Sequence, residues 1–166
     1  MMKERRKNEL NGSGEQVSFE DAKAYEDRCL KELRNAGYRI TMPRVQVIRA
    51  LGDSLTALSA YEIHEKIISS RGKIDVVSVY RILNTLLEVG LIHHIGVVDG
   101  YFPSRLQGAR GKSQHLVCDK CGNVMETRVP LTLIDAANDH AAKTNFTAEK
   151  IKIEVVGKCS NCQSDK

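Results

Sequence analysis

Two pairs of cysteines near the C-terminus have the spacing of metal ligands. Cys118 and Cys121 form one C-x-x-C pair, and Cys159 and Cys162 form the other. Each pair makes a tight turn that directs both sulfurs to one point, and Gly122 lets the backbone turn back at positive φ. Four thiolates are the ligand set of a closed, tetrahedral zinc site. The spacing therefore predicts a structural zinc ion that joins the two ends of a small C-terminal domain.

Other interpretations of these cysteines are a redox dithiol, a disulfide and unrelated buried thiols. A redox dithiol normally lies at a helix N-terminus, and we expect nothing helical after Cys121 or Cys162. The fifth cysteine, Cys29, lies in an apolar helical stripe, where we expect a small buried hydrophobe. A zinc hydrolase or deaminase is disfavoured because four cysteines close the coordination shell and no H-x-E motif precedes them.

The charge of the chain is unevenly distributed. The 166 residues carry a formal net charge of +4. Residues 1–112 hold 18 Lys and Arg against 14 Asp and Glu, whereas residues 113–166 hold 7 of each. This asymmetry suits a DNA-binding half joined to an assembly half, although a solvated face would show the same excess.

Nothing in the sequence indicates export or membrane insertion. No apolar run approaches the length of a membrane span, and the N-terminus lacks the apolar segment of a secretory signal. Because the thiols need a reducing compartment, we expect a cytoplasmic protein without a membrane partner. The length suits one ordinary domain or two small ones.

We expect the chain to begin with a disordered arm and a helix. Residues 1–17 are polar and include a basic cluster, and such segments do not fold alone. The first helix is expected to begin at Ser18, as its N-cap, and to end at Gly37.

Three further helices and a hairpin complete the N-terminal part. One helix is expected to start at Pro43, one to follow a capping box at Ser59–Glu62, and one to cover 76–89. Two short strands then flank the turn at Val98–Gly100. This order is that of a winged helix-turn-helix domain, whose last helix enters the major groove of DNA. We place this domain at residues 18–104.

The rest of the chain is expected to be a hinge and a small α/β domain. Residues 105–112 contain Gly and Arg without periodicity, which is typical of a hinge. Residues 113–166 are expected to form a three-stranded sheet with one helix, and the last strand covers 150–156. So small a sheet exposes an edge and an apolar face, which predicts a dimerisation domain. The predicted fold class is therefore α/β (α+β).

Five motifs carry a resemblance to a known family. They are Ala36-Gly37-Tyr38-Arg39-Ile40-Thr41-Met42-Pro43-Arg44, Ser59-Ala60-Tyr61-Glu62-Ile63, Ser78-Val79-Tyr80-Arg81-Ile82-Leu83, His115-Leu116-Val117-Cys118-Asp119-Lys120-Cys121-Gly122, and the last cysteine pair. With these motifs in this order, the chain resembles the ferric uptake regulator (Fur) family of bacterial metal- and peroxide-responsive transcription factors. The resemblance implies a winged-helix DNA-binding domain, a hinge, and a dimerisation domain with a four-cysteine structural zinc.

The resemblance also implies roles in DNA binding. Tyr80 and Arg81 match major-groove residues of the family, Arg39 a residue near the minor groove, and Arg44 a residue near the phosphates. Ser78 joins them because it lies with Arg81 in the first turns of the predicted recognition helix, where side chains reach base edges. For Tyr80, a place in the core is the alternative.

Most sensory metal ligands of the family are absent. The histidine-rich run before the first cysteine pair is reduced to His115. Residues that do not serve as ligands stand at the other ligand positions: Ala57, Pro103, Leu133 and Ile151. A site with one imidazole cannot hold a divalent ion selectively.

A regulatory site with other ligands is the alternative. His93 and Glu126 match sensory ligands of the zinc-uptake-regulator subgroup, and His115 is the third candidate. The subgroup's cysteine in the wing is Ser104 here, a poor zinc ligand. Without a metal, His93 is a wing residue near DNA and His115 is a satisfied strand histidine.

We predict a homodimeric DNA-binding transcriptional regulator, and specifically a repressor. A two-fold dimer presents two recognition helices, so it would bind a pseudo-palindromic operator in double-stranded DNA. The zinc is structural, and the regulatory metal site is reduced or absent. The alternatives are a zinc-responsive regulator of zinc uptake with a non-standard second site, a redox-responsive regulator that uses the four cysteines, and an interaction module without DNA binding.

Overall fold

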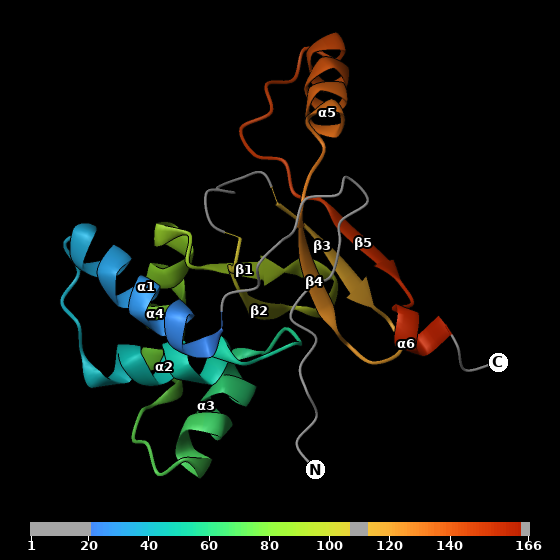
Figure 1. The fold of residues 1–166 in the computed structure, drawn as a ribbon. Helices are drawn as coiled ribbons and strands as arrows, with labels where there is room; N and C mark the ends of the chain where they lie inside the picture. The colour runs from blue at the N-terminus through green and yellow to red at the C-terminus, as the bar shows by residue number, and fades with distance from the viewer. Residues whose placement is uncertain (1–20, 107–112, 164–166) are drawn as a thin grey trace.

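The computed structural model describes residues 21–106 and 113–163. Figure 1 shows a helical half and a sheet half with a hairpin between them. The helical half contains α1 (Ala22–Asn35), α2 (Met42–Gly52), α3 (Ala60–Ser69) and α4 (Val76–Val89). The hairpin, here called the wing, is made of β1 (Ile92–Ile95), the 3-10 turn η1 (Gly96–Val98) and β2 (Gly100–Pro103). Helices followed by a hairpin are the order that the sequence predicts.

Capping residues mark the ends of α3 and α4 as the sequence predicts. Ser59 and Glu62 form the expected capping box, and the Glu62 carboxylate accepts a hydrogen bond from the Ser59 amide at 2.7 Å. Asp75 caps α4, and Gly90 ends it in the left-handed conformation at φ 77°. These caps satisfy backbone groups that helix ends leave without partners.

The first helix begins later than the sequence predicts. Its N-cap is Asp21, whose carboxylate accepts a hydrogen bond from the Ala24 amide at 2.8 Å. Aspartate is as good an N-cap as serine, and Asp21 lies closer to the buried face of α1. Ser18, the expected cap, and the predicted arm over 1–17 lie outside the described residues.

The four helices share one apolar core with the start of the wing. Its fully buried side chains include Tyr25, Cys29, Leu33, Val47, Ile48, Leu51, Ile63, Val79, Leu83 and Leu86. Most of these positions recur at the spacing of one helix face. The Tyr25 hydroxyl donates a hydrogen bond to the Leu91 carbonyl at 3.0 Å, so α1 also positions the wing.

A three-stranded sheet forms the second half. Its strands lie in the order β4 (Val124–Arg128), β3 (Ser113–Cys118) and β5 (Glu154–Gly157). Strand β3 pairs antiparallel with β4 and parallel with β5. Helix α5 (Leu131–Lys143) lies between β4 and β5 in the chain, and α6 (Ser160–Gln163) follows β5. The sheet and the helix α5 confirm the predicted composition of this half.

The last strand is shorter than predicted. Alternation over 150–156 predicts a strand throughout, but β5 starts at Glu154. Just before it, the Lys152 ammonium donates a hydrogen bond to the His94 carbonyl at 2.8 Å. This segment therefore contacts the wing before the chain enters the sheet.

Helix α5 stands clear of the rest of the molecule (Figure 1). None of its residues is buried, and Leu131 and Leu133 are 61% and 48% exposed. Helices of this length are marginal in water without a packed apolar face. This half of the chain therefore lacks a covering surface for its helix.

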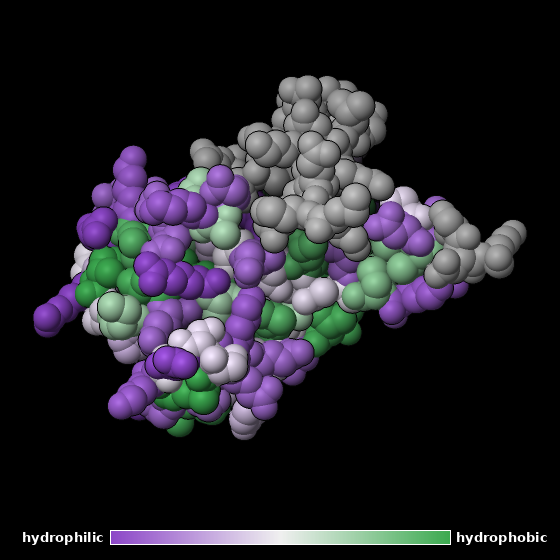
Figure 2. All heavy atoms as spheres, turned by 60° about the horizontal axis from the view of Figure 1, so that its bottom comes forward, coloured by the Kyte–Doolittle hydropathy of each residue, from purple (hydrophilic) through white to green (hydrophobic). Residues whose placement is uncertain are grey.

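Hydrophilic residues dominate the helical half in the view of Figure 2, with smaller apolar groups between them. The exposed apolar side chains of this half include Met42, Tyr61, Ile68 and Val77. Nowhere in residues 21–106 and 113–163 does a helix combine the length and the apolar character of a membrane span.

We expect Leu83→Ala to lower the free energy of unfolding by about 3 kcal/mol, because truncation of a buried leucine loses apolar contact and leaves a cavity. Leu83 is fully buried in α4, whereas Val77 on the same helix is 59% exposed. Val77→Ala is therefore the control, with an expected change below about 0.5 kcal/mol. Chemical denaturation followed by circular dichroism measures both values, and equal losses would contradict the assigned core face of α4.

Candidate metal centres and DNA-contacting surface

Two groups of side chains among the described residues have the composition of metal sites. In each group, one ligand atom per residue lies within 4.8 Å of the others. The groups are Cys118, Cys121, Cys159 and Cys162, and His93, His115 and Glu126. Both sets were singled out from the sequence, and the fold brings each set together.

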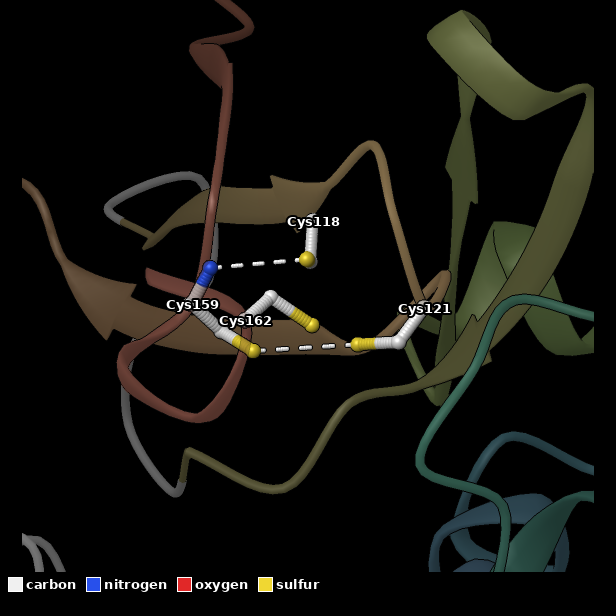
Figure 3. Close-up of side chains that lie close together, drawn as sticks. All are labelled: Cys118, Cys121, Cys159 and Cys162. Carbon is white, nitrogen blue, oxygen red and sulfur yellow. Dashed lines mark hydrogen bonds between the residues drawn. The ribbon is translucent and has the colours of Figure 1, made fainter. Parts of the chain in front are cut away.

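The four sulfurs of the first group point toward one another in Figure 3. Cys118 ends β3, and Cys162 lies in α6. The sulfurs of Cys121 and Cys159 are 3.7 Å apart. Zinc–sulfur bonds of about 2.3 Å in a tetrahedron place two sulfurs about 3.8 Å apart, whereas a disulfide bond is about 2.05 Å long. The cluster has the spacing of a tetrahedral metal site.

Backbone amides stabilise one of these sulfurs as a thiolate. The Cys159 amide donates a hydrogen bond to the Cys118 sulfur at 3.4 Å. This bond and one from the Cys121 amide lower the pKa of Cys118 to about 6. A hydrogen bond with the Cys159 thiol, together with burial, raises the pKa of Cys162 to about 12. A bound cation would reverse that preference, because coordinated thiols are deprotonated.

The turn after the first pair depends on a glycine. Gly122 has a φ of 71°, in the left-handed region. Its amide donates a hydrogen bond to the Cys118 carbonyl at 2.9 Å. Glycine adopts this conformation without steric cost, which confirms the role expected of Gly122.

A short helix lies at the second pair, and the expectation of nothing helical there is wrong. Helix α6 begins at Ser160, directly after Cys159, and contains Cys162. The Cys162 amide donates a hydrogen bond to the Cys159 carbonyl at 2.9 Å, so the C-x-x-C turn itself becomes helical. The convergence of four sulfurs, and not the absence of a helix, argues against an isolated dithiol.

The second group lies where the wing meets the sheet. His93 comes from β1, His115 from β3 and Glu126 from β4. His93 Nε2 is 2.7 Å from Glu126 Oε1, and the centroids of the His93 and His115 rings are 4.5 Å apart. An ion at this point would therefore be held by both halves of the chain.

The carboxylate of Glu126 is deeply buried and ionised. Its side chain is 1% exposed, and Oε2 accepts hydrogen bonds from the amides of Arg105 at 2.8 Å and Leu106 at 3.1 Å. Burial alone would raise the pKa of Glu126, but hydrogen bonds from His93 and from these amides outweigh it and lower the pKa. The group is thus available as an anionic ligand.

The start of the predicted hinge is fixed by the same contacts. Arg105 and Leu106 are 9% and 8% exposed. The Arg105 guanidinium also donates hydrogen bonds to the carbonyls of Gly52 and Ser54. Residues 107–112 lie outside the described residues, so the hinge and the domain boundaries stay predictions.

His115 has a ring nitrogen without a partner. Its Nε2 is buried and makes no hydrogen bond within the described part of the chain. Burial, and then the charge of His93, lowers the pKa of His115 to about 4, so the ring is neutral at neutral pH. Buried polar atoms rarely lack a partner, and a neutral imidazole is a common ligand of divalent metals. The residues present therefore fit a metal ion.

A cavity of about 690 Å³ opens beside this second group. His93, His115, Ser104 and Lys152 are among the residues that line it. Within the described residues, no fourth His, Cys, Asp or Glu joins the three ligands. Three protein ligands leave one position of a tetrahedral ion open to water or another small ligand.

Three of the predicted DNA-contacting residues present accessible side chains. Arg39 and Arg81 are exposed, and across residues 21–106 and 113–163 neither guanidinium has a hydrogen bond or an ion pair. Tyr80 is 41% exposed, with its ring at 6.5 Å from that of Tyr61. Tyr80 therefore lies on the surface, and not in the core.

The other two predicted residues have partners within the protein. The Arg44 guanidinium lies 5.3 Å from the centre of the Tyr38 ring and donates a hydrogen bond to the Arg39 carbonyl. The Ser78 hydroxyl donates a hydrogen bond to Asp75 Oδ2 at 2.6 Å, within the cap of α4. Contacts of Arg44 and Ser78 with DNA stay predictions.

Sequence reasoning missed two residues that connect the wing to the sheet. Lys152 bonds to the His94 carbonyl, and Glu154 bonds to the amides of Gly96 and Val97. Their charged positions within an alternating segment predict a solvent-facing side. The partners are 57 or 58 residues away, so no local pattern could have indicated them.

Comparisons with known proteins agree with this architecture. Residues 35–156 match the model of the Ferric uptake regulator family. The peroxide-responsive repressor PerR of Staphylococcus aureus (strain USA300) is 27% identical over 148 residues, which are 89% of this chain and 97% of PerR. A zinc uptake regulator complexed with zinc and DNA gives a TM-score of 0.78 at 26% identity, over 86% of this chain and 95% of that chain.

Two crystal structures of XcZur bear on how the halves are arranged. The holo form gives a TM-score of 0.75 at 21% identity, over 85% of this chain and 98% of that chain. The apo form gives 0.50 at 23% identity, over 87% and 99%. The arrangement of this chain is thus closer to the holo form. With a family match over most of its length and the same fold, the chain belongs to the ferric uptake regulator family and is a DNA-binding transcriptional regulator, not an enzyme.

Proposed function

We propose that this chain is a homodimeric repressor that responds to a divalent metal ion, with a structural zinc on its four cysteines. The regulatory ion is bound by His93, His115 and Glu126. The observation that carries this proposal is the convergence of the three ligands from the wing and from the sheet. The sequence predicts a reduced or absent regulatory site, and the geometry supports the reduced one.

Zinc is the ion that this site fits best. Two imidazoles and one carboxylate with an open fourth position are a known zinc ligand set. The likeness to a zinc uptake regulator complexed with zinc and DNA supports the same choice. Ser104 lines the adjoining cavity, so the fourth ligand in this chain would be water or another small molecule.

Metal binding would act on the position of the wing. His93 belongs to the wing, whereas His115 and Glu126 belong to the sheet. The full ligand set exists when the two halves are arranged as in this structure, so the ion stabilises this arrangement over others. The likeness to holo XcZur is consistent with this arrangement being the metal-bound one.

A second copy of the chain would cover the exposed apolar surface of the sheet half. Leu131, Leu133, Phe146, Val155 and Val156 are between 48% and 65% exposed. A two-fold dimer through this surface would place two α4 helices at a fixed separation. Such a dimer recognises two half-sites of a pseudo-palindromic DNA sequence.

We expect the purified protein to retain one zinc ion per chain after mild chelation, and Cys121→Ser to lose it, because three thiolates and a hydroxyl bind zinc far more weakly. Elemental analysis after dialysis against a chelator measures the zinc content. Asn161→Ala, an exposed position between the second pair, is the control and should keep the ion. Full retention of zinc by Cys121→Ser would contradict the assignment.

Redox control through the four cysteines is a second candidate, favoured by the exposure of Cys121. It differs from metal control in one respect. Loss of zinc and of DNA binding upon peroxide treatment, with the second metal site still loaded, would favour the redox candidate.

The regulatory site predicts a second ion that exchanges more readily. We expect His115→Ala to weaken binding of this ion by about 100-fold or more, since loss of even an outer partner of a metal ligand costs about 10- to 100-fold. Absorption spectroscopy during a Co²⁺ titration of the zinc-containing protein measures the affinity. His140→Ala, on the exposed surface of α5, should behave like the wild type. A wild-type protein without a second binding event would rule the site out.

DNA binding is tested with a duplex selected by the wild-type protein from a randomised pool. We expect Arg81→Ala to weaken binding by about 10- to 100-fold through the loss of a base contact, and Arg39→Ala to reduce the salt dependence. Fluorescence anisotropy at several salt concentrations measures both effects. Lys31→Ala, exposed on α1, is the control. Wild-type binding without salt dependence would instead favour an interaction module.

A further inference from the structure

A second connection between the wing and the sheet needs no metal ion. Glu154 of β5 accepts hydrogen bonds from the amides of Gly96 at 2.9 Å and Val97 at 3.0 Å. Lys152 donates a hydrogen bond to the His94 carbonyl at 2.8 Å and lies 3.2 Å from the Glu154 carboxylate. The Glu154 side chain is 11% exposed. Three backbone groups of the wing are thus held by two neighbouring side chains of the sheet half.

The wing turn depends on this carboxylate for its hydrogen bonding. The N-cap of η1 is Ile95, which offers no side-chain hydrogen bond. The first amides of a helical turn lack internal acceptors, and Gly96 and Val97 are the first two residues of η1. Glu154 provides the missing acceptors from another element. Such bonds to an ionised group are stronger than those between neutral groups.

The charge state of Glu154 favours this contact. Burial alone would raise its pKa, but the amides of Gly96 and Val97 and the Lys152 ammonium outweigh burial and lower it. The carboxylate is therefore ionised at neutral pH, with its hydrogen bonds to the wing intact.

We propose that Lys152 and Glu154 form a latch that holds the wing against the sheet without metal, so that Glu154 is a positioning residue for DNA binding. The inference deepens the proposed function and rests on it in one respect, namely that wing position governs DNA affinity. Glu154 lies opposite His115 in the parallel register of β5 and β3. The latch and the metal site are therefore adjacent restraints on the same arrangement.

Because the two restraints act on one arrangement, their effects on DNA affinity are not additive. Loss of the latch has its full effect in the metal-free state, where nothing else fixes the wing. A bound ion compensates for that loss. The latch thus sets how much DNA binding the protein retains when the regulatory site is empty of metal, and hence the range of the metal response.

The test compares Glu154→Ala and Glu154→Gln with Glu149→Gln, an exposed carboxylate of the same segment. The probe is the duplex selected by the wild-type protein, and affinity is measured with the structural zinc in place, before and after saturation with Zn²⁺. We expect Glu154→Ala to weaken metal-free binding by about tenfold, as for one charged hydrogen bond, and metal-loaded binding by less than about threefold. Glu154→Gln should be intermediate, and Glu149→Gln unchanged.

Hydrogen exchange at the Gly96 and Val97 amides provides a readout that general destabilisation would not mimic. Faster exchange confined to the wing is expected in Glu154→Ala, with zinc content and melting temperature close to the wild type. Equal weakening in both metal states, or unchanged protection of these amides, would overturn the latch. If the wild type selects no duplex, the proposed function fails, whereas the exchange data still decide whether the latch exists.

Discussion

The buried carboxylate of Glu126 is the interaction on which the arrangement of the two halves depends. It accepts hydrogen bonds from the backbone of Arg105 and Leu106, where the chain leaves the wing, and contacts His93 within the wing. An anion this deeply buried is tolerated because each oxygen has a partner. The same contacts bring His93 next to His115, so the packing that satisfies one charge also assembles a metal site.

The two metal centres have different relations to the fold. The four cysteines join the end of β3 to the residues that follow β5, within the sheet half. A zinc ion there would stabilise a small sheet whose apolar contacts are few. The histidine and glutamate group instead spans the sheet and the wing, with an open position beside a cavity. Structural and regulatory roles follow from these positions, because a closed thiolate site within one half cannot report on the position of the other.

Much of the local structure and both ligand sets were predictable from the sequence. The capping box at Ser59, the N-cap at Asp75 and Gly90 are local signals, and the structure has them where they were expected. The spacing of the cysteine pairs is local as well. The errors lie where neighbours decide the outcome: Asp21 replaces Ser18 as the N-cap, β5 starts only at Glu154, and α6 forms around Cys162.

The sequence by itself determined which residue types were available: four cysteines in two pairs, two histidines and a glutamate at separate positions, and the periodicity of four amphipathic helices. Only the tertiary structure decided that His93, His115 and Glu126 converge, that the Ser78 hydroxyl serves a helix cap, and that Glu154 holds the wing. The physical reason is that periodicity and capping are set by neighbours within a few residues. Contacts between the wing and the sheet join positions more than fifty residues apart, and packing alone brings these together.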